Sequence, residues 1–186
     1  MATLIYVTNM SLDGYIEDEQ GAFDWAQPDD DVFAATTALL RSVDTFLYGR
    51  RLYETMAVWE TNPALAEHSE LTADFASAWR AAGKVVYSTS LAAVSTATTR
   101  IERHFDPDAV RELKAETNSN LTIGGANLAA QAFEAGLVDE CQLFVWPMML
   151  GGGKSALPAG VRTDLELLDE HRFGNGVLQL RYRVPT

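Results

Sequence analysis

Three short polar segments each follow an apolar run that is typical of a buried strand. They are Gly49-Arg50-Arg51, Ser88-Thr89-Ser90 and Gly124-Gly125-Ala126, and the first and third also open predicted helices. Glycine lets a backbone approach a phosphate closely, a helix N-terminus offers free N–H groups, and arginine pairs with phosphate through two hydrogen bonds. Ligands of open α/β sheets bind beyond the carboxyl ends of the strands. Together the three segments therefore predict a cradle for a dinucleotide.

A second candidate for chemistry is the acidic run Asp29-Asp30-Asp31, which follows Pro28 at the start of a predicted helix. The helix dipole favours acids there whatever their function, so a purely structural interpretation is also open. As chemistry, a carboxylate at this place could bind the donor edge of an amino-pyrimidine and favour a protonated imine. We assign this role to Asp30, shielded by Trp25. A shift of one residue would give the role to Asp29 or Asp31.

Other catalytic patterns are weak in this sequence. The run Gly151-Gly152-Gly153-Lys154-Ser155 ends like a phosphate-binding P-loop, but Met148 stands where the first glycine is required. Pro158 also disfavours the helix that a P-loop needs after it. The three histidines are far apart and Cys141 is the single cysteine, so we expect no metal site and no intrachain disulfide. Inside a strand, Cys141 is predicted to be a small buried hydrophobe.

Composition indicates an ordinary globular protein with a small-molecule ligand. The 186 residues are 47% hydrophobic and 22% charged, which predicts one domain over 1–186. The net charge of −12 disfavours a nucleic-acid partner. No apolar stretch approaches the ~20 residues of a membrane span. Thr8 and Asn9 interrupt the N-terminal apolar run, which has no preceding basic residues, so we read it as a strand of a cytoplasmic protein.

The elements that must position these segments alternate along the chain between strand and helix. Strands are predicted at 4–8, 45–48, 84–87, 121–123 and 141–146, helices at 28–43, 50–58, 72–82, 106–117 and 127–135, and a closing hairpin at 165–172 and 177–184. The stretch 59–68 is predicted to be irregular. This order predicts an α/β fold with a mostly parallel central sheet, helices on both faces and a C-terminal antiparallel hairpin.

Several short motifs in a fixed order cover nearly the whole chain. They are Asn9-x-Ser11-Leu12-Asp13-Gly14, Tyr48-Gly49-Arg50, Ile123-Gly124-Gly125-Ala126-x-Leu128, Gly136-Leu137-Val138-Asp139-Glu140 and Pro147-x-x-Leu150-Gly151-Gly152-Gly153. This combination resembles the dihydrofolate-reductase superfamily and its three-layer fold. Within the superfamily it is more similar to the branch related to the C-terminal reductase domain of bifunctional riboflavin-biosynthesis deaminase–reductases.

The resemblance implies an NADPH-dependent reductase that transfers a hydride to a C=N bond of a pterin-like or pyrimidine-like molecule. It also implies a binding map. Gly49, Arg50 and Arg51 would hold cofactor phosphates; Ser88, Thr89 and Ser90 the adenosine ribose and its 2′-phosphate; Ile123, Gly124, Gly125, Ala126, Asn127 and Leu128 the pyrophosphate and nicotinamide; Val7 and Thr8 the nicotinamide; and Asn9, Trp25 and Asp30 the substrate. The stretch 58–79 contains no arginine that could hold a folate tail, which argues against dihydrofolate.

Two other functions remain open on the sequence. The chain could be a nucleotide-binding module without turnover, or a phosphotransferase that uses Gly153-Lys154-Ser155. The oligomeric state is also open. The resemblance implies a homodimer, and Phe144 and Trp146 share one face of a predicted strand, which suits a dimer interface or a core.

Overall fold

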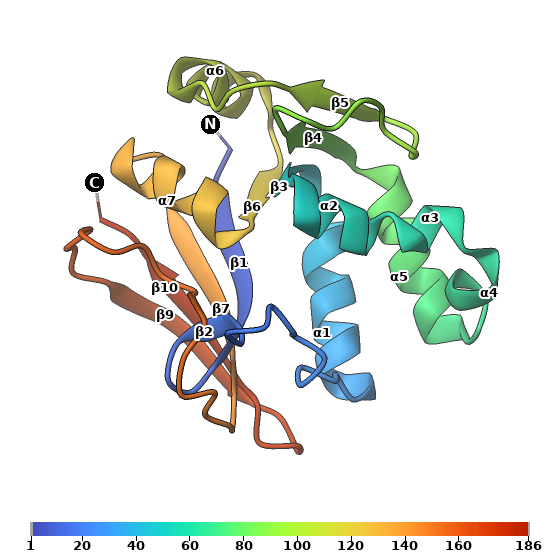
Figure 1. The fold of residues 1–186 in the computed structure, drawn as a ribbon, viewed down its shortest axis with the longest axis vertical. Coiled ribbons are helices and arrows are strands. Elements are labelled where there is room, and N and C mark those ends of the chain that lie inside the picture. Colours follow the sequence, from blue (N-terminus) through green and yellow to red (C-terminus); the bar gives the residue numbers. More distant parts are fainter. Residues whose placement is uncertain (1, 186) are drawn as a thin grey trace.

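An eight-stranded sheet forms the centre of the computed structural model, which describes residues 2–185 (Figure 1). In spatial order its strands are β5 (Thr99–Glu102), β4 (Gly83–Tyr87), β3 (Val43–Gly49), β6 (Asn120–Gly124), β1 (Leu4–Ser11), β7 (Glu140–Trp146), β10 (Leu178–Arg183) and β9 (Glu166–Arg172). The first six are parallel, and β10 and β9 are antiparallel to their neighbours. The predicted fold class is therefore confirmed.

Helices cover both faces of the parallel part of the sheet (Figure 1). They are α1 (Asp30–Arg41), α2 (Arg50–Met56), α3 (Val58–Thr61), α4 (Pro63–Ala66), α5 (Glu70–Ala81), α6 (Pro107–Glu116) and α7 (Ala126–Glu134). In β3, Phe46 and Tyr48 pack with α1, α2 and α5, whereas Leu47 packs with α6 and α7. This alternation follows from the two-residue repeat of a strand, so both faces of β3 are buried.

A two-stranded sheet joins two of the sequence motifs above the carboxyl ends of the strands. It pairs β2 (Tyr15–Glu17) with β8 (Lys154–Ser155) in antiparallel register. The Asp13 carboxylate accepts hydrogen bonds from the Leu150 and Gly151 N–H groups, at 3.1 and 2.7 Å. Gly153 has a φ of +131°, and a Cβ there would strike the backbone of Glu17. The glycine-rich run thus serves close packing, and Lys154 continues into a strand instead of the helix of a P-loop.

Three local predictions are corrected by the structure. Pro28 is not the first helical residue, because Asp29 is the N-cap of α1 and accepts a 3.0 Å hydrogen bond from the Val32 N–H. The stretch predicted to be irregular contains α3 and α4, and Asn62 caps α4. Strand β5 was not predicted, because its four residues have no apolar run and only pairing with β4 makes them a strand. The predicted start of the strand 84–87 is also one residue late, since β4 begins at Gly83.

The apolar face of β7 belongs to the core of this chain. Phe144 and Trp146 are 1% and 7% exposed and pack with Val32, Phe173 and Val177. Cys141, on the other face, is buried as predicted, and burial raises the pKa of its thiol to about 11. Of the two interpretations of the β7 face, the structure therefore supports a core. No helix among residues 2–185 has the length and apolar character to cross a membrane.

Asp139, in the motif Gly136-Leu137-Val138-Asp139-Glu140, stabilises the fold, and its replacement gives a first prediction. The Asp139 carboxylate accepts hydrogen bonds from the Leu4 N–H at 2.7 Å and from the Lys114 ammonium at 2.6 Å. The Lys114 side chain is only 9% exposed. Because Asp139→Asn leaves that buried charge unpaired, we expect the free energy of unfolding to fall by about 1–3 kcal/mol, a range lowered for the partial exposure of Asp139.

Urea denaturation measures this change, and Glu166→Gln is the matched control. Glu166 pairs with Arg183 on the surface, where both side chains are more than half exposed. That control should lower the free energy of unfolding by less than about 0.5 kcal/mol. Equal losses in the two variants would contradict a structural role for Asp139.

Candidate functional site

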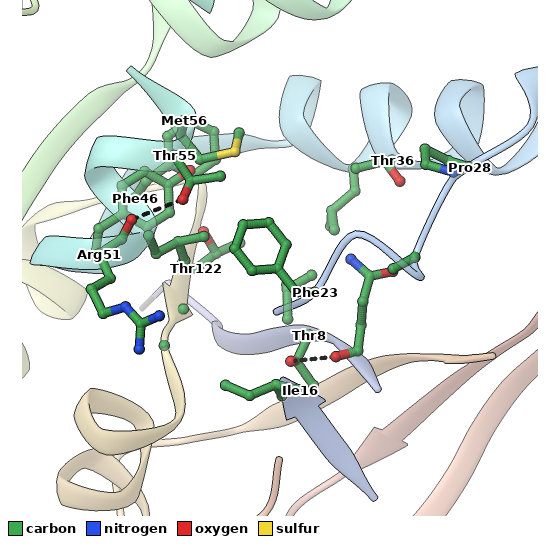
Figure 2. Close-up of a pocket in the computed structure, with 18 of the residues that line it drawn as sticks. Thr8, Ile16, Phe23, Pro28, Thr36, Phe46, Arg51, Thr55, Met56 and Thr122 are labelled. Atoms are coloured by element: carbon green, nitrogen blue, oxygen red, sulfur yellow. Dashed lines mark hydrogen bonds between the residues drawn. The ribbon is translucent and has the colours of Figure 1, made fainter. Parts of the chain in front are cut away.

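A cavity of about 760 Å³ lies at the carboxyl ends of β1, β3 and β6 (Figure 2). Thr8, Tyr48 and Gly124 line it from these three strands. Helices α1 and α2, the loop over 18–29 and the β2–β8 sheet form the remaining walls. The cavity is thus where the sheet topology predicts a ligand site.

The structure brings part of the predicted site to this cavity. The predicted cofactor residues that line it are Val7, Thr8, Arg51, Ile123, Gly124 and Gly125; of the predicted substrate residues Asn9 lines it and Trp25 does not. The other predicted cofactor residues lie outside the lining: Gly49, Arg50, Ser88, Thr89, Ser90, Ala126, Asn127 and Leu128. Among these, Leu128 is buried in the core between the sheet and α7, so its side chain has a packing role. The remaining residues lie at the strand and helix ends beside the cavity.

Two glycine turns meet at one edge of the cavity. Gly125 has a φ of +94° and precedes α7, whose N-terminus has no side-chain cap. A Cβ on Gly125 would stand 3.8 Å from the Gly49 nitrogen, so the turn after β6 faces the turn after β3. Glycine is favoured at position 124 by close packing, because a Cβ there would collide with the Leu52 side chain. The uncapped N–H groups of α7 and the close approach of two backbones suit a phosphate group.

Two arginines hold the loop after β4 beside these turns. The Arg50 guanidinium donates to the Ser90 hydroxyl at 3.0 Å and to Glu54 at 2.7 Å. Arg103, which follows β5, donates through Nη1 to the Ser88 and Leu91 carbonyl oxygens, at 3.0 and 2.7 Å. The hydrogen bond between Arg50 and Ser90 therefore joins two of the three predicted segments, Gly49-Arg50-Arg51 and Ser88-Thr89-Ser90. Sequence reasoning missed Arg103, because its place depends on the unpredicted strand β5.

The rim of the cavity carries charges of both signs. Arg51 donates to the Glu17 carboxylate at 3.1 Å and so links α2 to the small β2–β8 sheet. Lys154 lines the same rim from β8. Neither Glu17 nor Lys154 was predicted as a cavity residue. For Lys154 the only signal was the Gly-Lys-Ser run, and for Glu17 the sequence offers none.

The acidic run lies at the start of α1, and none of its three residues lines the cavity. Asp30 and Asp31 are exposed, whereas Asp29 is half-buried and its carboxylate accepts a hydrogen bond from the Val32 N–H. Val32 itself lines the cavity. The role predicted for Asp30 stays a prediction, and the alternative position, Asp29, is the one that contacts a lining residue.

Polar groups near this end of the cavity are neutral. Trp146 donates to the Asn9 amide oxygen at 2.9 Å, and the Trp25 indole N–H is buried without a hydrogen-bond partner. Burial raises the pKa of Tyr48, whose hydroxyl accepts a hydrogen bond from Trp79. Tyr48 therefore stays protonated. Residues 2–185 contain no group of three side chains that could hold a metal ion.

Comparisons with known proteins agree with this architecture. Residues 2–179 match the model of the RibD C-terminal domain family. The uncharacterized protein YyaP of Bacillus subtilis (strain 168) is 28% identical over 175 residues, which cover 93% of this chain and 90% of YyaP. A protein of Shewanella sp. PV-4 with a provisional riboflavin-biosynthesis name is 20% identical, with a TM-score of 0.77 and full coverage of both chains.

A third similar structure is longer than this chain. The diaminohydroxyphosphoribosylaminopyrimidine deaminase/5-amino-6-(5-phosphoribosylamino)uracil reductase of Thermotoga maritima is 13% identical, with a TM-score of 0.65. The match covers 99% of this chain and 57% of that protein. At this identity the similarity establishes a shared fold.

Proposed function

This chain belongs to the family of RibD C-terminal domains, and we propose that it is an NADPH-dependent reductase of a pterin-like or pyrimidine-like small molecule. The family gives it a pyrimidine-reductase-like fold. The cofactor, the hydride transfer and the substrate are our proposal, and they rest on the geometry of the cavity.

The observation that carries the proposal is the meeting of the two glycine turns beside an arginine and a serine. Gly125 faces Gly49 at the uncapped start of α7, and Arg50 is hydrogen-bonded to Ser90 a short distance along the same edge. Backbone N–H groups would hold a pyrophosphate there, while Arg50 and Ser90 would hold a ribose phosphate. The open cavity next to Gly125 then leaves space for a nicotinamide ring and a substrate.

NADPH, when bound, supplies the hydride, and the chain has to orient the two rings and exclude water. The backbone of Gly124 and Gly125 fits a flat ring against the sheet, because neither residue has a side chain to obstruct it. Val7 and Thr8 approach the same place from β1. A carboxylate at the start of α1 would orient the donor edge of the substrate, and a water molecule would deliver the proton.

The direct test is NADPH binding followed by turnover. NADPH should bind with a measurable dissociation constant in a fluorescence titration, and its oxidation should depend on an added dihydropterin or amino-pyrimidine. An absence of NADPH binding by the folded protein would refute the proposal.

A nucleotide-binding module without turnover is the second candidate. It is favoured by the exposure of Asp30 and by the lack of any carboxylate among the residues of α1 that line the cavity. Such a module would bind NADPH yet give no oxidation with any substrate in a single-turnover experiment.

Arg103 gives a prediction about cofactor choice. The hydrogen bonds that the Arg103 guanidinium makes to the described residues all come from its Nη1 atom. Its other N–H groups would then be able to donate to a 2′-phosphate beside the Ser88–Ser90 loop. In Arg103→Gln we expect NADPH affinity to fall about tenfold, the effect of one charge-assisted hydrogen bond, with NADH affinity unchanged.

Arg100→Gln is the control, because it removes the same charge from β5 at a residue that pairs with Glu102. Both dissociation constants should be measured at fixed ionic strength. If Arg103→Gln weakens NADPH and NADH equally, Arg103 only supports the loop.

A further inference from the structure

The substrate end of the cavity has almost no charge. Its wall on α1 consists of Val32, Phe33, Thr36, Leu39 and Leu40, and α5 adds Phe75. The Thr36 hydroxyl donates to the Val32 carbonyl within its own helix. This wall therefore offers a ligand apolar surface and no cation.

The charged residues that line the cavity, among those described, all belong to its rim. They are Glu17 and Lys154 from the β2–β8 sheet, and Arg51 and Glu54 from α2. With two acids and two bases the rim has no net charge. Arg51 is paired with Glu17 and lies beside the cofactor turns, on the opposite side of Figure 2 from Thr36 and Pro28. A phosphate at the α1 end would thus have no countercharge among the lining residues of α1 and α5.

An aromatic side chain is also left uncovered at this end. Phe23 lines the cavity from the 18–29 loop, and it is 49% exposed. Its ring points toward the middle of the cavity in Figure 2. Two further aromatic side chains of the lining, Phe33 and Phe75, pack on each other with their ring centroids 4.8 Å apart. A flat apolar ligand would cover Phe23 and contact a wall that is already packed.

From this cavity we infer the substrate class: a neutral aromatic heterocycle with an apolar substituent, not a phosphoribosylated pyrimidine. The inference rests on the proposed function. The inferred substrate differs from the one in the name of the Thermotoga maritima neighbour, because that substrate carries a phosphoribosyl group. In the reaction, a hydride from NADPH adds to the carbon of the C=N bond and a proton from water adds to its nitrogen. NADPH becomes NADP⁺.

The test compares two probes with the protein saturated with NADPH. The probes are 6-phenyl-7,8-dihydropterin, which is neutral and apolar, and 5-amino-6-(5-phosphoribosylamino)uracil. The dihydropterin should bind at least about tenfold more tightly and should be the one that is reduced. Tighter or equal binding of the phosphorylated probe, or binding of neither, would overturn the inference.

Phe23→Ser provides the matching variant. It should weaken dihydropterin binding about tenfold, because it removes the exposed ring from the cavity. Leu12→Ser is the control, since Leu12 is 64% exposed on the neighbouring turn and does not line the cavity. Equal effects of the two variants would contradict the assigned site.

The two proposals fail in different ways. If NADPH does not bind but the dihydropterin binds and depends on Phe23, the reductase function is wrong and the ligand class holds. If NADPH binds and is oxidised only with the phosphorylated probe, the function holds and the ligand class is wrong.

Discussion

Replacing Gly125 with valine is expected to weaken NADPH binding by about 100-fold or more while the protein stays folded. A Cβ at this position points into the narrow space between the turns after β6 and β3, 3.8 Å from the Gly49 nitrogen. That space is where we place the pyrophosphate. Loss of two charge-assisted hydrogen bonds, at roughly 1.5–3 kcal/mol each, corresponds to at least that change in affinity.

The variant also strains the backbone, so it needs a control at another glycine with a positive φ. Gly125 has a φ of +94°, which a β-branched residue adopts only at a cost. Gly136→Val places the same side chain at a φ of +63° at the other end of α7, with no atom within 4 Å of the new Cβ. Both variants should be checked by circular dichroism before NADPH titration.

The comparison of the two variants decides the role of the turn. We expect Gly136→Val to bind NADPH normally. If Gly125→Val is folded and binds as well as Gly136→Val, the glycine turn is only structural. Should Gly125→Val fail to fold, Gly125→Ala gives the same comparison with Gly136→Ala.

Replacing Asp29 with asparagine is expected to slow hydride transfer by about 10²–10⁴-fold, with NADPH affinity unchanged. Asp29 stands at the start of α1, where its carboxylate would accept hydrogen bonds from the donor edge of a substrate ring. Asparagine is as good an N-cap as aspartate, so the hydrogen bond to the Val32 N–H and the fold should persist. The change therefore removes the charge alone.

Asp30→Asn is the paired variant, since Asp30 is the adjacent acid and is exposed, whereas Asp29 is half-buried. Cofactor affinity and single-turnover reduction should be measured separately on both proteins. Slow reduction in Asp30→Asn alone would return the role to Asp30, as the sequence first suggested. Normal reduction in both variants would show that neither acid at the start of α1 has this role. A loss of NADPH affinity with normal hydride transfer would show that the cofactor and substrate pockets have been assigned wrongly.

The sequence was sufficient for the parallel core and for the glycine turns. The run 121–123 is short, rich in β-branched residues and bounded by a glycine pair, which is typical of a strand. Gly124 and Gly125 follow that strand and precede a helix, so their place at its carboxyl end depends on local order alone. The segment at Gly49-Arg50 was found by the same reasoning, and the Arg50–Ser90 hydrogen bond agrees with it.

Tertiary structure decided the features that depend on contacts between distant segments. Strand β5 has no pattern of its own and exists by pairing with β4, which in turn places Arg103 beside Ser88. The run before Lys154 resembled a P-loop, but Gly153 is required because the backbone of Glu17 and Asp18 is packed against it.

The orientation of α1 was likewise set by packing. Burial of Val32 against the β7 side chains Phe144 and Trp146 fixes the rotation of the helix, and at its start Asp29 is half-buried whereas Asp30 is exposed. The sequence places three consecutive acids about 100° apart around a helix axis. It states which residues are available, but only the contacts of the folded helix determine which of them reaches a ligand.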